Sequence, residues 1–150
     1  MVTIFWWINW LGNKWVLLPA TLLLLWAGPP EARRRWWLWA AVMIAAPMLE
    51  WLGKGLIGRP RPEGTAFGFP SGHATGAAAY FFLSAYLIGR PLDRPGARVV
   101  LLWIVAAVLV GLVGLARIVL RAHWPGDALA GATLGLACVS LAAWYHERSR

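Results

Sequence analysis

The sequence predicts an all-α integral membrane protein, a helical bundle of about five transmembrane helices. Hydrophobic residues make up 60% of the 150 residues and charged residues only 13%, a composition far from that of an ordinary water-soluble domain. The apolar runs follow one another with short connections, which leaves no room for a separate soluble domain. We therefore expect a single membrane domain over residues 1–150.

Five apolar segments approach the length of about 17 to 20 residues that a helix needs to cross the hydrocarbon of a bilayer. They cover residues 10–27, 36–52, 74–88, 99–116 and 128–145. In the first segment we expect Pro19 to kink the helix or to end its first half, and an interfacial helix at its start is the alternative. In the fourth, Gly111 and Gly114 predict close approach of a neighbouring helix. The N-terminus lacks the pattern of a signal peptide, so the first segment is expected to remain as an anchor.

The distribution of positive charge predicts the orientation in the membrane. The formal net charge is +8, but the cations are divided among short loops and do not form the single basic face of a nucleic-acid binder, so no nucleic-acid partner is expected. If the five segments alternate in direction, eight of the fourteen Lys and Arg residues share one side: Arg33, Arg34, Arg35, Arg90, Arg94, Arg98, Arg148 and Arg150. That side is expected to be cytoplasmic. The N-terminus is then expected outside the cytoplasm and the C-terminus inside it.

Polar residues of the opposite, extracytoplasmic side form three motifs. They are Lys54-x6-Arg61-Pro62, Phe69-Pro70-Ser71-Gly72-His73 and Arg117-x5-His123-x3-Asp127. Charged and titratable groups are costly inside a bilayer, so in a chain this apolar they are expected where they have a function. The alternation of the helices brings all three motifs to the same side, which predicts one composite site for phosphate chemistry at the helix ends.

These motifs, in this order and with this spacing, resemble the signature of the type 2 phosphatidic acid phosphatase superfamily: Lys-x6-Arg-Pro, Pro-Ser-Gly-His and Ser-Arg-x5-His-x3-Asp. The resemblance implies a bacterial inner-membrane enzyme that hydrolyses a lipid phosphate monoester or diphosphate through a phosphohistidine, without a metal or other cofactor. Two features depart from the family. Ala116 stands where the family usually has Ser, which we expect to remove one hydrogen bond to the phosphate, and five segments are found where bacterial members commonly have six.

The resemblance implies a lipid substrate but not which one. Phosphatidic acid, phosphatidylglycerol phosphate and polyprenyl diphosphates such as undecaprenyl diphosphate are the family's substrates. A polyprenyl diphosphate is favoured, because the cell envelope recycles that carrier on its outer side, and this preference rests on family analogy alone. The expected partners are thus the lipid substrate and the membrane lipids, and nothing in the sequence indicates an oligomeric state.

His123 and Asp127 are the candidate nucleophile and the group that orients it. Pro125 fits the first turn of a helix, so His123 is expected at the helix entrance with Asp127 one turn inside, close enough to bond the imidazole. A carboxylate bound to one ring nitrogen fixes the tautomer and leaves the other nitrogen free to attack phosphorus, and the family resemblance assigns the same roles. A histidine that merely caps the helix is the alternative when the pair is taken alone.

Ser71, Gly72 and His73 are expected to open the third predicted helix. Ser71 is a natural N-cap, Gly72 permits close approach of the backbone, and the free N–H groups of a helix start form an anion site. His73 is then placed to protonate the departing lipid oxygen. The alternative is a simple cap with Gly72 and Gly76 as helix-packing residues, which leaves the histidine unexplained.

Lys54, Arg61 and Arg117 are the predicted phosphate-binding cations, because positive groups stabilise the charge that spreads over the phosphoryl oxygens during transfer. Glu50, one helical turn before Lys54, offers a purely structural ion pair as the alternative role for that lysine. We interpret Arg59 as an anchor for lipid headgroups.

No metal site is predicted, because a hard cation needs several oxygen ligands and the carboxylates of the site side are few: Glu50, Glu63 and Asp127. Cys138 is the single cysteine, so no intramolecular disulfide is possible. His146, in the C-terminal tail, is interpreted as a solvated residue and not as a third catalytic histidine.

Two other functions are weighed against a phosphatase. A vanadate-dependent peroxidase resembles the same motif set, because vanadate imitates phosphate, but its soluble helical scaffold does not match this composition. A non-enzymatic phospholipid-binding protein that retains an anion pocket would be favoured by loss of His73, His123 or Asp127, and all three are present.

Overall fold

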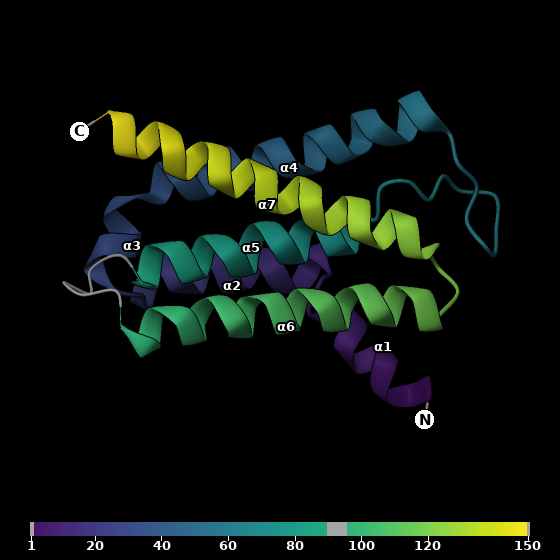
Figure 1. Cartoon of the computed structure of the whole chain (residues 1–150), viewed down its shortest axis with the longest axis horizontal. Coiled ribbons are helices and arrows are strands. Elements are labelled where there is room, and N and C mark those ends of the chain that lie inside the picture. Colours follow the sequence, from purple (N-terminus) through teal and green to yellow (C-terminus); the bar gives the residue numbers. More distant parts are fainter. Residues whose placement is uncertain (1, 90–95, 150) are drawn as a thin grey trace.

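The protein is a bundle whose long helices run side by side (Figure 1). The computed structural model describes residues 2–89 and 96–149. Within these residues there are seven helices and no strand beyond an isolated bridge between Pro60 and Phe67, so the predicted all-α fold is confirmed. The helices are α1 Val2–Trp10, α2 Lys14–Ala27, α3 Pro30–Arg34, α4 Trp36–Ile57, α5 Gly72–Gly89, α6 Ala97–Val119 and α7 Pro125–Arg148.

Helix α5 lies at the centre of the bundle, where it contacts α7, α6, α4 and α2. Its packing surface is rich in alanines that are at most 1% exposed: Ala74, Ala77, Ala78 and Ala79. Helix α7 approaches it through two glycines. A Cβ on Gly131 would lie 2.4 Å from the Ser71 carbonyl oxygen. One on Gly135 would lie 2.5 Å from the Thr75 carbonyl oxygen, so only glycine permits this separation of the two helices.

The predicted close approach at Gly111 is wrong. Nothing lies within 4 Å of a Cβ built there, because Gly111 is on the exposed side of α6. At Gly114 a Cβ would make only an ordinary contact, 3.7 Å from the Cβ of Ala128. The sequence shows that small residues are present, but not which of them faces a neighbouring helix.

The first predicted segment, residues 10–27, is divided differently from our expectation. Helix α1 ends at Trp10, and α2 begins at Lys14 after Asn13, whose Oδ1 accepts a 3.0 Å hydrogen bond from the Trp15 N–H. The two helices meet at an angle of 45°. Pro19 lies inside α2 without ending it, so the break is made by the polar cap and not by the proline.

Helix α4 continues to Ile57, beyond the predicted end at residue 52, and so carries Lys54 in its last turn. Gly58 ends the helix with a φ of 59°, and its N–H donates to the Lys54 carbonyl oxygen at 3.0 Å. Helices α5, α6 and α7 contain the remaining three predicted segments and extend them at both ends.

Three helices of the described residues are long and apolar enough to cross a membrane, namely α4, α6 and α7. The bent pair of α1 and α2 would be a fourth if it forms one span. Helix α5 does not meet this criterion, and it is also the helix most enclosed by others. The total of five spans therefore remains a prediction.

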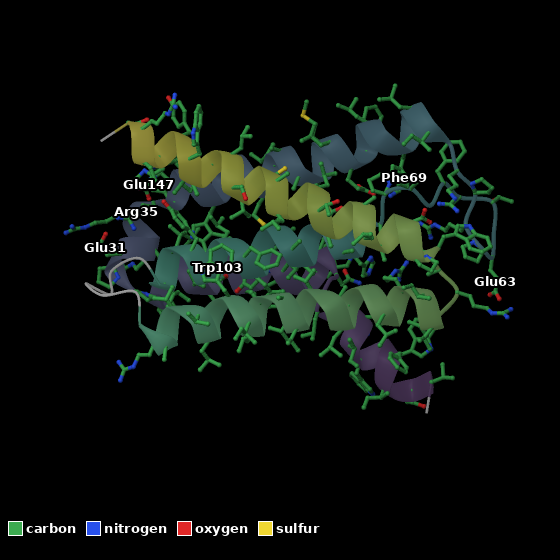
Figure 2. The ribbon with its side chains drawn as sticks, in the orientation of Figure 1. Glu31, Arg35, Glu63, Phe69, Trp103 and Glu147 are labelled. Carbon is green, nitrogen blue, oxygen red and sulfur yellow. The ribbon has the colours of Figure 1, made fainter. Side chains whose placement is uncertain are left out.

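All three motifs lie at one end of the bundle, which we call the motif end. It holds the loop between α4 and α5 and the turn between α6 and α7, at the right of Figure 1, while the C-terminus lies at the left. Figure 2 shows Glu63 and Phe69 at this end and Glu31, Arg35 and Glu147 at the other. The alternation of helix directions expected from the sequence is thus present in the structure.

The opposite end is held together by polar contacts of its own. Arg35 Nη2 pairs with Glu31 Oε2 at 3.1 Å, and the Tyr86 hydroxyl donates to Glu147 Oε1 at 2.8 Å. His146 also lies here, partly buried against the Trp37 ring, so it is less solvated than we predicted. Of the arginines predicted for this side, three fall outside the described residues: Arg90, Arg94 and Arg150.

Gly135, in the contact between α5 and α7, and Gly111, on the exposed side of α6, differ in the space beside them, so their substitution should have different effects on stability. Gly135→Ala should destabilise the protein by about 1–3 kcal/mol, because the new methyl group meets backbone that cannot move aside. Gly111→Ala, which adds the same group in open space, should leave the thermal midpoint unchanged or slightly raised. Thermal unfolding of both purified variants in detergent measures the difference, and equal midpoints would contradict the packing described here.

Candidate active site

Lys54 joins the end of α4 to the loop that follows it. Its Nζ donates to the Pro70 carbonyl oxygen at 2.8 Å and pairs with the Glu50 carboxylate. The structural ion pair considered from the sequence is therefore present. An ammonium has three N–H donors, so a third remains for an anion.

Arg61 lies in the loop between α4 and α5, which folds back on itself. Its backbone N–H donates to the Ala66 carbonyl oxygen, and its Nε donates to the Phe67 carbonyl oxygen, both at 3.3 Å. Both acceptors are neutral, so the guanidinium keeps its full charge and the donors of its two terminal nitrogens.

Ser71, Gly72 and His73 stand at the start of α5, as predicted, but the Ser71 side chain does not cap the helix. Its Oγ is buried and has no hydrogen-bond partner. The Ser71 N–H donates to the Asp127 carbonyl oxygen at 2.9 Å, which joins this helix start to α7. A Cβ on Gly72 would lie 2.9 Å from Glu50 Oε1, so a larger residue here would displace the Glu50 carboxylate. An unpartnered buried hydroxyl beside a free helix N-terminus is suited to an anionic ligand.

Arg117 and His123 are held together by the turn between α6 and α7. The Arg117 carbonyl oxygen accepts hydrogen bonds from the N–H groups of Ala122 and His123, at 3.0 and 3.2 Å. The Arg117 side chain is buried, and its Nη1 donates to Asn9 Oδ1 of α1 at 2.7 Å. Its Nε is also buried and has no partner.

His123 stands at the entrance of α7 with Asp127 one turn inside, as predicted from Pro125. Asp127 Oδ2 accepts a 3.0 Å hydrogen bond from the Trp124 N–H and lies 3.7 Å from His123 Nδ1. The second distance is longer than a hydrogen bond. Catalytic hydrogen bonds are often long in sites without substrate and shorten when it binds.

The electrostatic surroundings of His123 bring the three motifs together. Burial, followed by the positive charges of Arg117, Arg61 and Lys54, lowers the pKa of the His123 imidazole to about 3. The ring is therefore neutral near pH 7, the form whose nitrogen lone pair can act as a nucleophile. Burial, followed by the charges of these cations, also lowers the pKa of His73 to about 4. Each motif thus contributes a group to one small region.

Arg59, which we interpret from the sequence as a headgroup anchor, has a partner in the site that the sequence did not reveal. Its Nη1 pairs with Asp127 Oδ1 at 3.2 Å, and its guanidinium lies over the Trp124 ring at 5.7 Å from the centroid. Asp127 is therefore held on one oxygen by Arg59 and on the other by a backbone N–H. Because Arg59 lies in an irregular loop, no periodicity of the sequence indicates this contact.

Asn9 is the other site neighbour that the motifs do not reveal. The sequence held one indication of its role: burying an amide side chain in an apolar segment costs free energy unless a hydrogen-bond partner compensates. Arg121, at the rim, has a φ of 51° and pairs with Glu63 at 3.4 Å, with both side chains exposed.

Two clefts reach this region. One of about 530 Å³ lies between α2, α4 and α5, has the apolar residues Leu17, Met43 and Pro47 in its walls, and reaches His73. We call it the α2–α4 cleft. The other, of about 470 Å³, lies beside Lys54 and Arg61. Among the described residues, no three His, Cys, Asp or Glu side chains lie close enough together to hold a metal ion.

Solved structures share this fold. A crystal structure described as a transmembrane PAP2 type phosphatidylglycerolphosphate phosphatase from Bacillus subtilis superposes with a TM-score of 0.78 over 99% of this chain and 78% of that one, at 24% identity. Aquifex aeolicus LpxE superposes with a TM-score of 0.71 over 96% of this chain and 86% of that one, at 21% identity. At these identities the similarity shows the fold alone.

Sequence comparison is more specific. Phosphatidylglycerophosphatase B of Bacillus subtilis is 31% identical over 149 residues, which cover 94% of this chain and 73% of that protein. Decaprenylphosphoryl-5-phosphoribose phosphatase of Mycobacterium tuberculosis is 33% identical over 116 residues, 71% of this chain and 58% of that protein. The model of the PAP2 superfamily matches residues 59–150, which include Arg61, Ser71, Gly72, His73, Arg117, His123 and Asp127. The resemblance seen in the motifs is therefore confirmed, and the chain belongs to the PAP2 superfamily.

Proposed function

We propose that this chain is a membrane phosphatase that hydrolyses a lipid phosphate monoester or diphosphate through a phosphohistidine, without a metal ion. The observation that carries the proposal is the neutral, buried His123, which lies within the field of three cations: Arg117, Arg61 and Lys54. The two relatives described above are both named as phosphatases of lipid-linked phosphates, which supports the same class of reaction.

In the first step, His123 Nε2 attacks phosphorus and the bond from phosphorus to the leaving oxygen breaks. On substrate binding, Asp127 Oδ2 closes from 3.7 Å to hydrogen-bond distance and holds the N–H of Nδ1, so that the attacking nitrogen carries the lone pair. His73 donates a proton to the departing oxygen from its imidazolium form. Burial and the neighbouring cations lower the pKa of His73, and the negative charge of the bound substrate opposes this effect and favours the protonated ring. In the second step, His73 takes a proton from a water molecule as the water oxygen attacks phosphorus. The bond between phosphorus and His123 Nε2 breaks, which releases inorganic phosphate and returns His123 to its neutral form.

The phosphoryl oxygens are held by the groups that lack an acceptor in the structure. These are the Ser71 hydroxyl, the N–H groups at the start of α5, the Nε of Arg117 and the remaining donors of Lys54 and Arg61. Because three cations already supply positive charge where it develops, the mechanism needs no metal ion for this purpose.

The α2–α4 cleft supports a lipid as the leaving group. It begins at His73, the residue that protonates the departing oxygen, and its walls are mainly apolar. Such a cleft accepts either acyl or prenyl chains. The similarity to phosphatidylglycerophosphatase B favours phosphatidylglycerol phosphate over the polyprenyl diphosphate favoured from the sequence, and both belong in the test.

We further propose that the motif end faces the extracytoplasmic side of a bacterial inner membrane. Five described arginines at the opposite end support this orientation, because positive residues in short loops tend to stay in the cytoplasm. They are Arg33, Arg34, Arg35, Arg98 and Arg148.

The purified protein should release phosphate from one or more members of a panel of phosphatidic acid, phosphatidylglycerol phosphate and undecaprenyl diphosphate, with EDTA present. His123→Ala should lower kcat by about 10³-fold or more, because the nucleophile is lost. His146→Gln, at the opposite end of the bundle, is the matched control and should retain activity. Turnover that EDTA abolishes and Mg²⁺ restores would refute the metal-independent mechanism, and unchanged activity of His123→Ala would refute its nucleophile.

The orientation is tested by single cysteines in a Cys138→Ser background, at Thr65 of the motif end and at Ala97 of the opposite end, both exposed. A membrane-impermeant maleimide should label Thr65→Cys in spheroplasts, whereas Ala97→Cys should react only after permeabilisation. The reverse pattern would place the site in the cytoplasm.

A further inference from the structure

We propose that Asn9, in the N-terminal helix α1, is a positioning residue for Arg117 in phosphate binding. The inference rests on the proposed function and deepens it by adding a residue that belongs to none of the three motifs. Asn9 also lies outside the part of the chain that the family model matches.

Helix α1 buries a polar residue and exposes its apolar ones, the opposite of a helix that packs by apolar contacts. Its large apolar side chains are exposed, with Trp6 57% and Trp7 72% accessible, whereas Asn9 is its one buried residue, at 7%. Burying an amide costs free energy unless a hydrogen bond compensates. The compensating partner is Arg117 Nη1 of α6, which is 2.7 Å from Asn9 Oδ1. The contact is therefore the polar centre of the docking of α1 on α6.

The same contact restricts Arg117. Its guanidinium is a planar fork with five N–H donors, so a fixed Nη1 limits the directions in which the others can point. Its Nε is buried and has no partner, which leaves that donor free for a phosphoryl oxygen. Holding a long side chain in a productive orientation before the substrate arrives removes an entropy cost from the transition state.

The partner of Arg117 is a neutral amide, and this affects how much of the arginine's charge remains for an anion. Lys54 pairs with Glu50, and Arg59 pairs with Asp127, so both of those cations have a carboxylate partner. Arg117 is held by an amide oxygen, which fixes the guanidinium without neutralising it. A carboxylate in the same place would hold Arg117 as firmly but would compete with the phosphate for its charge.

This difference separates positioning from a merely structural contact. Asn9→Asp keeps the shape of the side chain and its acceptor, so a structural contact predicts a stable and fully active variant. A positioning role predicts a stable variant with weak anion binding. Asn9→Ala removes the acceptor and is the complementary change, and Thr3→Asp adds the same charge at an exposed position of α1 as the matched control.

The test measures kcat, KM, the inhibition constant of orthovanadate and the thermal midpoint for each variant of the full chain. Vanadate is the probe because it adopts the trigonal bipyramidal shape of the transferring phosphoryl group. We expect Asn9→Ala to weaken vanadate inhibition and lower kcat/KM by about 10- to 100-fold, as for a lost hydrogen bond to a charged group. We expect Asn9→Asp to weaken both as well, because its carboxylate keeps the hydrogen bond but competes with the anion for the charge of Arg117. The Asn9→Asp midpoint should equal or exceed that of the wild type. Thr3→Asp should match the wild type in all four quantities.

An Asn9→Asp variant with wild-type vanadate inhibition would overturn the inference, and so would losses of activity that follow the thermal midpoint in every variant. In an Arg117→Lys background, Asn9→Ala should cause little further loss, because the residue acts through the arginine, and fully additive losses would contradict that route. A wild-type protein that neither hydrolyses the lipid panel nor binds vanadate would instead refute the proposed function.

Discussion

The site depends on the direct contact between the start of α5 and the start of α7. The Ser71 N–H donates to the Asp127 carbonyl oxygen at 2.9 Å, and Gly131 and Gly135 allow the two helices to approach until only glycine fits between them. One of these helix starts carries His73 and the other carries Asp127 with His123 just before it. His73 and Asp127 are therefore placed by backbone contacts between two rigid helices. His123 is held in the short turn before α7, where its N–H donates to the Arg117 carbonyl oxygen.

Around this contact the cations divide into two kinds. Lys54 and Arg59 have carboxylate partners and hold neighbouring structure in place: Lys54 binds the carbonyl of Pro70, and Arg59 binds Asp127. Arg61 and Arg117 have only neutral acceptors, so no carboxylate offsets their charge. Burial, followed by the charges of Arg117, Arg61 and Lys54, lowers the pKa of His123 and keeps the ring neutral. A bound phosphate anion would balance this positive charge.

Much of this arrangement could be predicted from the sequence because it depends on local rules. Pro125 marks the start of α7, and the alternation of apolar segments brings the motifs to one end. The contacts between distant segments could not be predicted from the sequence. Arg59 reaches Asp127 across 68 positions and Asn9 reaches Arg117 across 108, and neither loop geometry nor the inward face of a short helix can be read from a periodic pattern. The prediction for Gly111 was wrong for the same reason, since the rotation of a helix about its axis decides whether a small residue faces a neighbouring helix or the lipid.

In the proposed mechanism the phosphoryl group is transferred to His123 while His73 protonates the leaving oxygen. Trapping the covalent intermediate tests this mechanism most directly. Enzyme quenched during turnover of a lipid labelled in its phosphate should carry an acid-labile, base-stable label, and proteolysis should place that label on the peptide containing His123. His73→Ala should still accumulate label from a substrate whose good leaving group needs little protonation. A label on His73, or none on His123 during turnover, would contradict the account.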